Sequence, residues 1–113
     1  RTASITGAFV ALSIAVNKLL QYGAVKSSPI RDRVAATSVG VVDGVPLLDL
    51  CYDEDSRAEV DMNVVMTGQG RFIELQATAE KTAFDDQQLL ALLELGRRGI
   101  QDLLKLQDEA IGA

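Results

Sequence analysis

The sequence of 113 residues has no histidine and only one cysteine, and each shortage excludes a class of site. Without histidine, the chain cannot form a Ser-His-Asp triad, a Cys-His pair or a histidine-ligated metal site from its own residues. With Cys51 alone, it can form neither an intrachain disulfide nor a cysteine zinc site. The unpaired thiol indicates a reducing compartment, for which we expect the cytoplasm. A metal held by this chain would have oxygen ligands, which suit Mg²⁺, Mn²⁺ or Ca²⁺.

Positive charge is also scarce, because eleven Lys and Arg stand against sixteen Asp and Glu, for a formal net charge of −5. Taken alone, this balance disfavours nucleic-acid binding. Apolar residues make up 48% of the chain, which suffices for one small folded domain. We predict no membrane span, because polar residues interrupt the most apolar stretch, Ile5 to Leu20. The chain begins with Arg1 rather than Met, so we expect a processed product or a fragment.

The hydrophobic pattern predicts a helix, four strands and a second helix, an order typical of an α+β fold in which helices cover antiparallel hairpins. The strands are expected at residues 34–42, 45–52, 60–67 and 71–78, and the helices at residues 2–22 and 86–108. Asp43-Gly44 is a strong two-residue hairpin signal between the first two strands. Asp85 with Gln88 predicts a capping box at the start of the second helix.

The first predicted helix carries a stripe of small residues that we expect to pack closely on a sheet. The stripe recurs every fourth residue and consists of Ala3, Gly7, Ala11 and Ala15. The second helix presents a broad apolar face to the same core. Its members are Leu89, Leu92, Leu93, Gly96, Ile100, Leu103 and Leu104.

The densest chemical feature is an acidic cluster, in which five of the sixteen acids lie in the nine residues 53–61. Like charges this close repel one another, and a hard divalent cation offsets the repulsion by bridging carboxylates. Asp61 alternates with apolar neighbours on a predicted strand, so its carboxylate needs a partner on a partly covered face. The hairpin could bring Asp55 beside it. A solvated acidic loop without metal is the alternative that composition leaves open, and an EF-hand is excluded by the spacing.

The N-terminal residues Arg1-Thr2-Ala3-Ser4 form a second candidate site, because they open the first predicted helix. The free amides and the positive dipole end of a helix can hold an anion. Arg1 adds a planar, permanently charged fork that suits phosphate. The alternative is an ordinary helix start, since many helices begin with a Thr or Ser cap.

Taken in order, these segments resemble the ribonuclease PH family over essentially the whole chain. Residues 1–8 resemble the helix that begins the family's phosphate site. The other matching segments are residues 38–44 and 47–50 in its central hairpin, 54–56 and 61–67 in its acidic signature, and 73–76 and 78–80 beyond it.

The resemblance implies a ribosomal protein S5 domain 2-like fold and a phosphorolytic 3′→5′ exoribonuclease that trims tRNA precursors. Inorganic phosphate attacks the terminal phosphodiester and releases a nucleoside diphosphate. The reverse reaction adds nucleotides, so the enzyme is also a tRNA nucleotidyltransferase. The family implies Mg²⁺ or Mn²⁺ as the cofactor and a homo-oligomer, a hexameric ring built as a trimer of dimers.

The resemblance also implies a role for individual residues. Arg1 matches the family's phosphate-binding arginine, and Thr2 is a weaker candidate through its backbone amide. Asp55 and Asp61 match the pair of aspartates used for catalysis and as metal ligands. The other acids of the cluster match less well and would only add to the negative electrostatic field around Asp55 and Asp61. They are Asp53, Glu54 and Glu59. Asn63 lies where related polynucleotide phosphorylases carry a lysine, so no electrostatic role is assigned to it.

The family's chain is longer, and its first half is absent before Arg1. We therefore expect residues 1–113 to be the C-terminal half of a single domain, inactive without the N-terminal half that carries further basic residues for RNA. Two alternatives remain open: a non-catalytic RNA-binding subunit of an exosome-like ring, and a plain α+β assembly domain whose acids are solvated.

Overall fold

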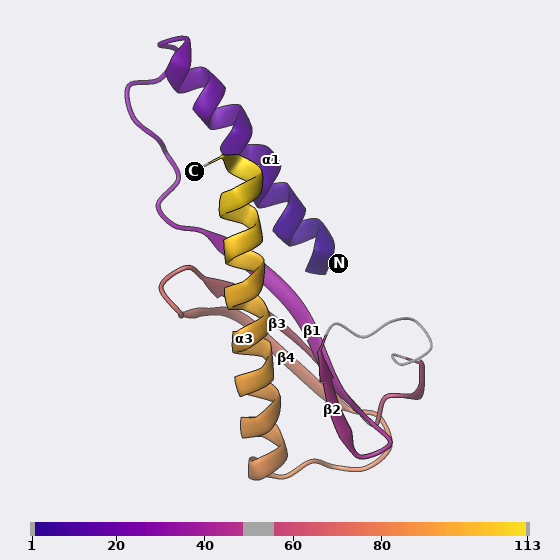
Figure 1. Cartoon of the computed structure of the whole chain (residues 1–113). Coiled ribbons are helices and arrows are strands. Elements are labelled where there is room, and N and C mark those ends of the chain that lie inside the picture. Colours follow the sequence, from indigo (N-terminus) through magenta and orange to yellow (C-terminus); the bar gives the residue numbers. More distant parts are fainter. Residues whose placement is uncertain (1, 49–55, 113) are drawn as a thin grey trace.

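A computed structural model describes residues 2–48 and 56–112, and it has the predicted α+β order (Figure 1). The elements are helix α1 (Thr2–Gln21), strands β1 (Val34–Val42), β2 (Val45–Leu48), β3 (Val60–Thr67) and β4 (Phe72–Ala79), and helix α3 (Asp86–Ile111). In Figure 1, α3 runs along the sheet while α1 lies at one end of it and extends beyond. The rest of the strand predicted over residues 45–52 lies outside the described residues.

The strands form one antiparallel sheet in the order β2-β1-β3-β4. The predicted hairpin between β1 and β2 is confirmed, since Val42 is paired with Val45 across Asp43 and Gly44. Both turn residues have positive φ, 52° and 77°, as a type I′ turn requires. A bulge between Val65 and Met66 leaves one extra residue on β4. This strand begins and ends one residue later than predicted.

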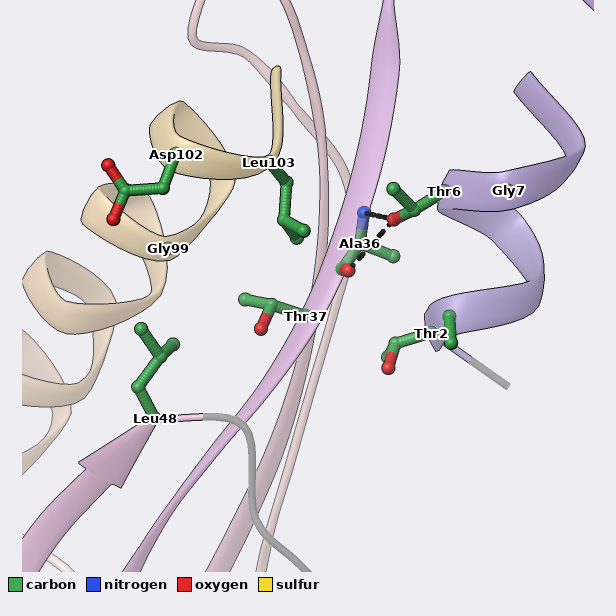
Figure 2. A pocket seen from close by; sticks show the side chains of 10 residues that line it. Thr2, Thr6, Gly7, Ala36, Thr37, Leu48, Gly99, Asp102 and Leu103 are labelled. Carbon is green, nitrogen blue, oxygen red and sulfur yellow. Dashed lines mark hydrogen bonds between the residues drawn. The ribbon is translucent and has the colours of Figure 1, made fainter. Parts of the chain in front are cut away.

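Helix α1 is attached to the edge of β1 through a threonine. The Thr6 hydroxyl donates to the Ala36 carbonyl at 3.1 Å and accepts from the Ala36 amide at 3.0 Å, as Figure 2 shows. These backbone groups of Ala36 point away from β3, toward α1. The side chain of Thr6 thereby completes the hydrogen bonding of a strand edge that would otherwise be unpaired there.

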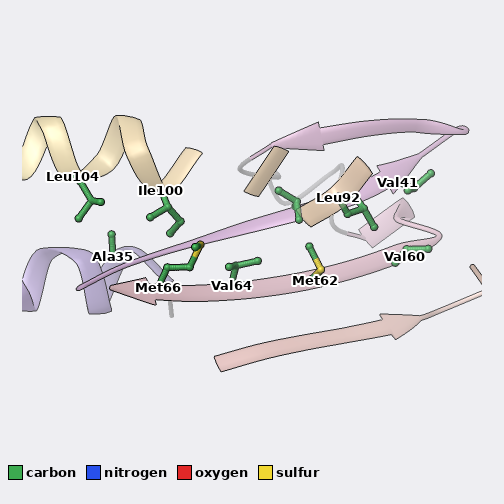
Figure 3. Close-up of a cluster of buried hydrophobic side chains, with 10 residues drawn as sticks. Ala35, Val41, Val60, Met62, Val64, Met66, Leu92, Ile100 and Leu104 are labelled. Atoms are coloured by element: carbon green, nitrogen blue, oxygen red, sulfur yellow. The ribbon is translucent and has the colours of Figure 1, made fainter. Parts of the chain in front are cut away.

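The core lies between α3 and one face of the sheet (Figure 3). Met62, Val64 and Met66 of β3 point toward it, and Leu92 and Ile100 of α3 fill it from the other side. The apolar face predicted for the second helix is confirmed for Leu92, Gly96, Ile100 and Leu104, which are buried. The remaining members, Leu89, Leu93 and Leu103, are partly buried against the cluster.

Two glycines let α3 approach the sheet closely. A Cβ atom on Gly96 would lie 3.2 Å from Cγ2 of Val64, and one on Gly99 would lie 2.6 Å from Cδ1 of Leu48. Both glycines are buried. The helix therefore rests mainly on β1 and β2, and β4 forms the more open edge of the sheet.

The predicted capping box of α3 is confirmed. The Asp85 carboxylate accepts from the Gln88 amide at 2.9 Å, and the Asp85 amide donates to the Gln88 side-chain oxygen at 3.0 Å. The helix runs three residues beyond the predicted end, to Ile111, and terminates at Gly112 with φ 83°. A left-handed glycine at this position satisfies the last carbonyls of the helix.

The small-residue stripe of α1 does not pack on the sheet, so that prediction is wrong. Ala3, Gly7, Ala11 and Ala15 are exposed, and the buried residues of α1 are Phe9, Ser13 and Val16. The larger side chains face the edge of β1 because they bury more apolar area there than alanine or glycine.

Among the described helices, α1 alone has the length and hydropathy of a membrane span, with a mean hydropathy of 1.6 over an 18-residue window. A core helix of a water-soluble protein passes the same test.

Candidate phosphate and metal site

The first turn of α1 forms one half of the candidate site. Thr2 is half-buried, and the turn carries no acidic residue that would oppose the positive end of the helix dipole. The free amides at a helix start are unsatisfied donors that suit an oxyanion. Arg1, the other predicted phosphate ligand, lies outside the described residues.

Three elements hold this helix start in position. Thr6 and Ala36 form two of the hydrogen bonds. In addition, the side-chain amide of Gln107 on α3 donates through Nε2 to the Thr6 carbonyl at 3.1 Å and to the Val34 carbonyl at 2.9 Å. Gln107 is buried, and its side-chain oxygen has no hydrogen-bond partner in the described part of the chain. Its amide therefore links α1, β1 and α3 in one place, which fixes where the first turn of α1 points.

Removing the Thr6 hydroxyl is expected to loosen this attachment. Thr6→Val keeps the shape of the side chain but leaves the Ala36 amide and carbonyl without their partner. We expect a loss of about 1–3 kcal/mol in the free energy of unfolding, measured by urea denaturation of the intact protein. Thr6→Ser retains the hydroxyl and serves as the control. A loss of stability in Thr6→Ser without a loss in Thr6→Val would show that the methyl group, and not the hydrogen bonds, holds the helix.

A cavity of about 430 Å³ opens beside the helix start, between α1, β1, β2 and α3 (Figure 2). Thr2, Leu48, Gly99 and Asp102 contribute to its wall, and the hydroxyl of Thr37 points into it. Thr37 is 4% exposed. The carboxylate of Asp102 would repel an anion inside this cavity. A phosphate therefore fits better ahead of Thr2, at the open end of the helix, than deep in the cavity.

Asp61 occupies the predicted position on β3, with a half-buried side chain. The strand register places it opposite Gly40 of β1 and Thr78 of β4. Its neighbours Val60 and Met62 are in the core, so Asp61 lies on the sheet face turned away from α3. This confirms the alternation from which its position was predicted.

The structure does not bring Asp61 into the cavity beside Thr2. Along β1, Gly40 lies four residues from Ala36, about 13 Å at the usual rise of a strand. Among the residues that the structure describes, the wall of the cavity includes Thr2 but not Asp61. Asp55, which was predicted to lie beside Asp61, is outside the described residues, as are Asp53 and Glu54.

The chemistry of Asp61 fits a hard divalent cation. A half-buried carboxylate with Asn63 two residues on, on the same strand face, presents oxygen donors of the kind that Mg²⁺ and Mn²⁺ prefer. Within residues 2–48 and 56–112, no group of three or more Asp, Glu or Cys side chains gathers to form a complete metal site. A site completed by Asp55 therefore stays a prediction.

Two other residues of the acidic segment are placed by the sheet. The Glu59 amide donates to the Val41 carbonyl at 2.7 Å, and the Glu59 carbonyl accepts from the Glu80 amide at 2.8 Å. Arg57 lies 3.7 Å from the Asp43 carboxylate of the hairpin turn, with both side chains largely exposed. Such a surface pair adds little stability. The backbone bonds of Glu59 therefore fix the entry into β3 and the position of Asp61.

Sequence reasoning missed three residues of the site. Thr6 was included in the resembling segment 1–8 but received no role, although a threonine on the buried side of an apolar helix is a signal for a polar partner. Gln107 follows Leu104 on the buried face of α3, where a polar residue must find hydrogen bonds. Thr37 sits in an apolar strand, and no local pattern shows that a cavity faces it.

The fold agrees with the comparison to known proteins. The chain belongs to the 3′ exoribonuclease family, because the model of domain 2 of that family matches residues 32–99. This match covers the whole sheet and the first half of α3. The fold class predicted from the sequence, the α+β fold of a ribonuclease PH C-terminal domain, is confirmed.

The chain is similar to proteins named ribonuclease PH. It is 64% identical over 111 residues to the one from Solibacter usitatus, a match that covers 98% of this chain and 47% of that protein. It is 56% identical over 112 residues to the one from Syntrophomonas wolfei, covering 99% of this chain and 47% of that protein. The chain spans about half the length of these curated relatives and matches their C-terminal half.

Proposed function

We propose that the protein containing this chain is a phosphorolytic 3′→5′ exoribonuclease that trims the 3′ ends of tRNA precursors and, in reverse, adds nucleotides. The observation that carries the proposal is the 64% identity with a ribonuclease PH over 98% of the chain. The start of α1 supports it, because its free amides and acid-free first turn suit an attacking phosphate.

In the proposed reaction, inorganic phosphate is held by Arg1 and by the backbone amide of Thr2, in line with the terminal phosphodiester of RNA. Asp61 protonates the leaving 3′ oxygen, which requires a carboxylic acid but no histidine. Asp55 and Asp61 would hold Mg²⁺ or Mn²⁺, which supplies charge compensation for the phosphate oxygens. The bond from the terminal phosphorus to the 3′ oxygen breaks as the bond to inorganic phosphate forms, and a nucleoside diphosphate leaves.

The partners follow from the same proposal. RNA 3′ ends, chiefly those of tRNA precursors, are the substrate, and the other half of the polypeptide supplies basic surface that a chain of net charge −5 lacks. We further propose a homo-oligomeric ring, a hexamer built as a trimer of dimers, in the cytoplasm.

The function is tested by digesting a tRNA that carries extra 3′ nucleotides with the intact protein. We expect nucleoside diphosphates to be released only when inorganic phosphate is present. Nucleoside monophosphates released without phosphate would show hydrolysis instead. Retention of the RNA without any release would favour a non-catalytic subunit of an exosome-like ring.

A further inference from the structure

A row of uncharged polar side chains crosses the sheet one step from Asp61. The strand register places Ser38 of β1 opposite Asn63 of β3, and Asn63 opposite Gln76 of β4. We call these three residues the polar row. Directly opposed residues of an antiparallel sheet share a face, and so do residues two apart on one strand. The polar row therefore lies on the same face as Asp61, turned away from α3, at a distance of about 7 Å along β3.

Two members of the polar row are held firmly by the sheet. Ser38 and Asn63 are half-buried, whereas Gln76 is exposed on the edge strand. Asn63 lies on a central strand, because β3 is paired with β1 on one side and with β4 on the other. Groups carried by such a strand are more precisely placed than groups on a loop. The side chain of Asn63 therefore presents its NH₂ donor and its oxygen acceptor from a fixed backbone position.

Ser38 lies on β1 between the two parts of the candidate site. Two residues before it, Ala36 is bound to Thr6 of α1, as Figure 2 shows. Two residues after it, Gly40 lies opposite Asp61. An RNA end that reaches from a phosphate at the helix start to the Asp61 carboxylate therefore lies beside the polar row.

The charges around the polar row favour a neutral partner over a phosphate. The paired positions of β1, β3 and β4 in this row and in the two rows beside it include the carboxylates of Asp61 and Glu74 and no Lys or Arg. A phosphate oxygen at these positions would be repelled. A ribose 2′-hydroxyl is neutral and both donates and accepts hydrogen bonds, which matches the side-chain amide of Asn63.

We propose that Asn63, together with Ser38, binds the 2′-hydroxyl of the ribose whose 3′ oxygen leaves, an inference that rests on the proposed function. In that reaction Asp61 is at the leaving 3′ oxygen, and the 2′-hydroxyl is on the adjacent ribose carbon. Asn63 is the next residue of β3 on the same face, so its amide reaches the neighbouring hydroxyl. The two side chains thereby make the site selective for an RNA end over a DNA end.

Two oligonucleotides that differ in one hydroxyl test the inference. One is RNA throughout, and the other has a single 2′-deoxyribose at the penultimate nucleotide. Release of the terminal nucleoside diphosphate by the intact protein gives kcat/KM for each substrate, and the selectivity is the ratio of the two values. Loss of the 2′-hydroxyl also makes the 3′ oxygen a poorer leaving group, but this contribution is common to every variant. A change of selectivity between variants therefore reports contacts to the hydroxyl.

Asn63→Ala is expected to lower the selectivity by about 10-fold, because it removes the hydrogen bonds to the hydroxyl. The loss falls on the RNA substrate, while the rate with the deoxy substrate changes little. Gln69→Ala is the control, since it removes an exposed side-chain amide from the turn after β3 and should keep the selectivity of the parent protein. Ser38→Ala, expected to lower the selectivity as well, provides a second variant if Asn63→Ala does not fold.

The outcomes separate this inference from the proposed function. A parent protein that releases no nucleoside diphosphate from the RNA substrate would refute the proposed function and the inference with it. An active parent with equal losses on both substrates in Asn63→Ala would overturn the inference alone, because a merely structural role lowers both rates together. An unchanged selectivity with a raised Mg²⁺ requirement would also overturn it and would assign Asn63 to the cation.

Discussion

Asp61→Asn in the intact protein is expected to lower the rate of phosphorolysis by at least about 100-fold, the usual loss when a positioned general acid is removed. The substitution preserves the size of the side chain on β3 and removes its negative charge and its ability to give up a proton. Asp61 is half-buried, and the strand register fixes it opposite Gly40. A large loss of rate without a loss of folding therefore identifies chemistry at this position.

The matched control is Asp43→Asn. Asp43 lies at the exposed hairpin turn with φ 52°, and asparagine tolerates this left-handed conformation as well as aspartate does. Both variants lose one negative charge, so a general effect of net charge would appear in both. The assay is the release of nucleoside diphosphate from a tRNA with extra 3′ nucleotides. An unchanged rate in Asp61→Asn would refute the role of this carboxylate in proton transfer.

Leu92→Ala is expected to destabilise the protein by about 2–5 kcal/mol, the range for truncating a fully buried leucine. Leu92 is 0% exposed and fills the core opposite Met62 (Figure 3). The substitution removes three carbon atoms from a position where α3 already lies close to the sheet, because even an added Cβ atom on Gly96, one turn later, would lie 3.2 Å from Cγ2 of Val64. A cavity therefore remains.

Leu90→Ala on the same helix is the control, since Leu90 is 66% exposed. Its expected effect is within about 0.5 kcal/mol, as for other surface substitutions. Urea denaturation followed by circular dichroism measures both variants against the parent protein. Similar losses for the two leucines would mean that α3 does not present the face seen here to the core.

The elements that local chemistry defines were predicted well. Asp43-Gly44 predicted the first hairpin because a type I′ turn matches the strand twist and needs two positive φ angles, which few residue pairs allow. The capping box at Asp85 fixed the start of α3 for a similar reason. The bounds of β1 and β3 agree with their patterns of β-branched residues.

The errors arose where tertiary contacts determine which face of an element is buried and how strands pair. A small-residue stripe shows that a surface can be approached closely, but it does not tell which surface approaches, and the sheet takes Phe9, Ser13 and Val16 instead. The bulge on β4 depends on pairing with β3, which the alternation of β4 alone does not encode.

Only the part of the candidate site that depends on patterns within one element could be predicted from the sequence. Asp61 was found from its alternation on one strand, and Thr2 from its place at a helix start. The contacts that orient that helix start join residues far apart in the sequence: Thr6 meets Ala36, and Gln107 meets Thr6. Spacing within one element carries no information on such contacts. Arg1 and Asp55 were candidates from the helix start and the acidic cluster, and the family resemblance gave each of them a role. Their placement stays a prediction.

The most direct test follows the fate of phosphate itself. The intact protein is incubated with ³²P-labelled inorganic phosphate and an unlabelled tRNA that carries extra 3′ nucleotides. We predict that the label appears in the terminal phosphate of the released nucleoside diphosphates, because the attacking phosphate becomes that group. Nucleotides released without the label would contradict phosphorolysis and, with it, the role proposed for the start of α1.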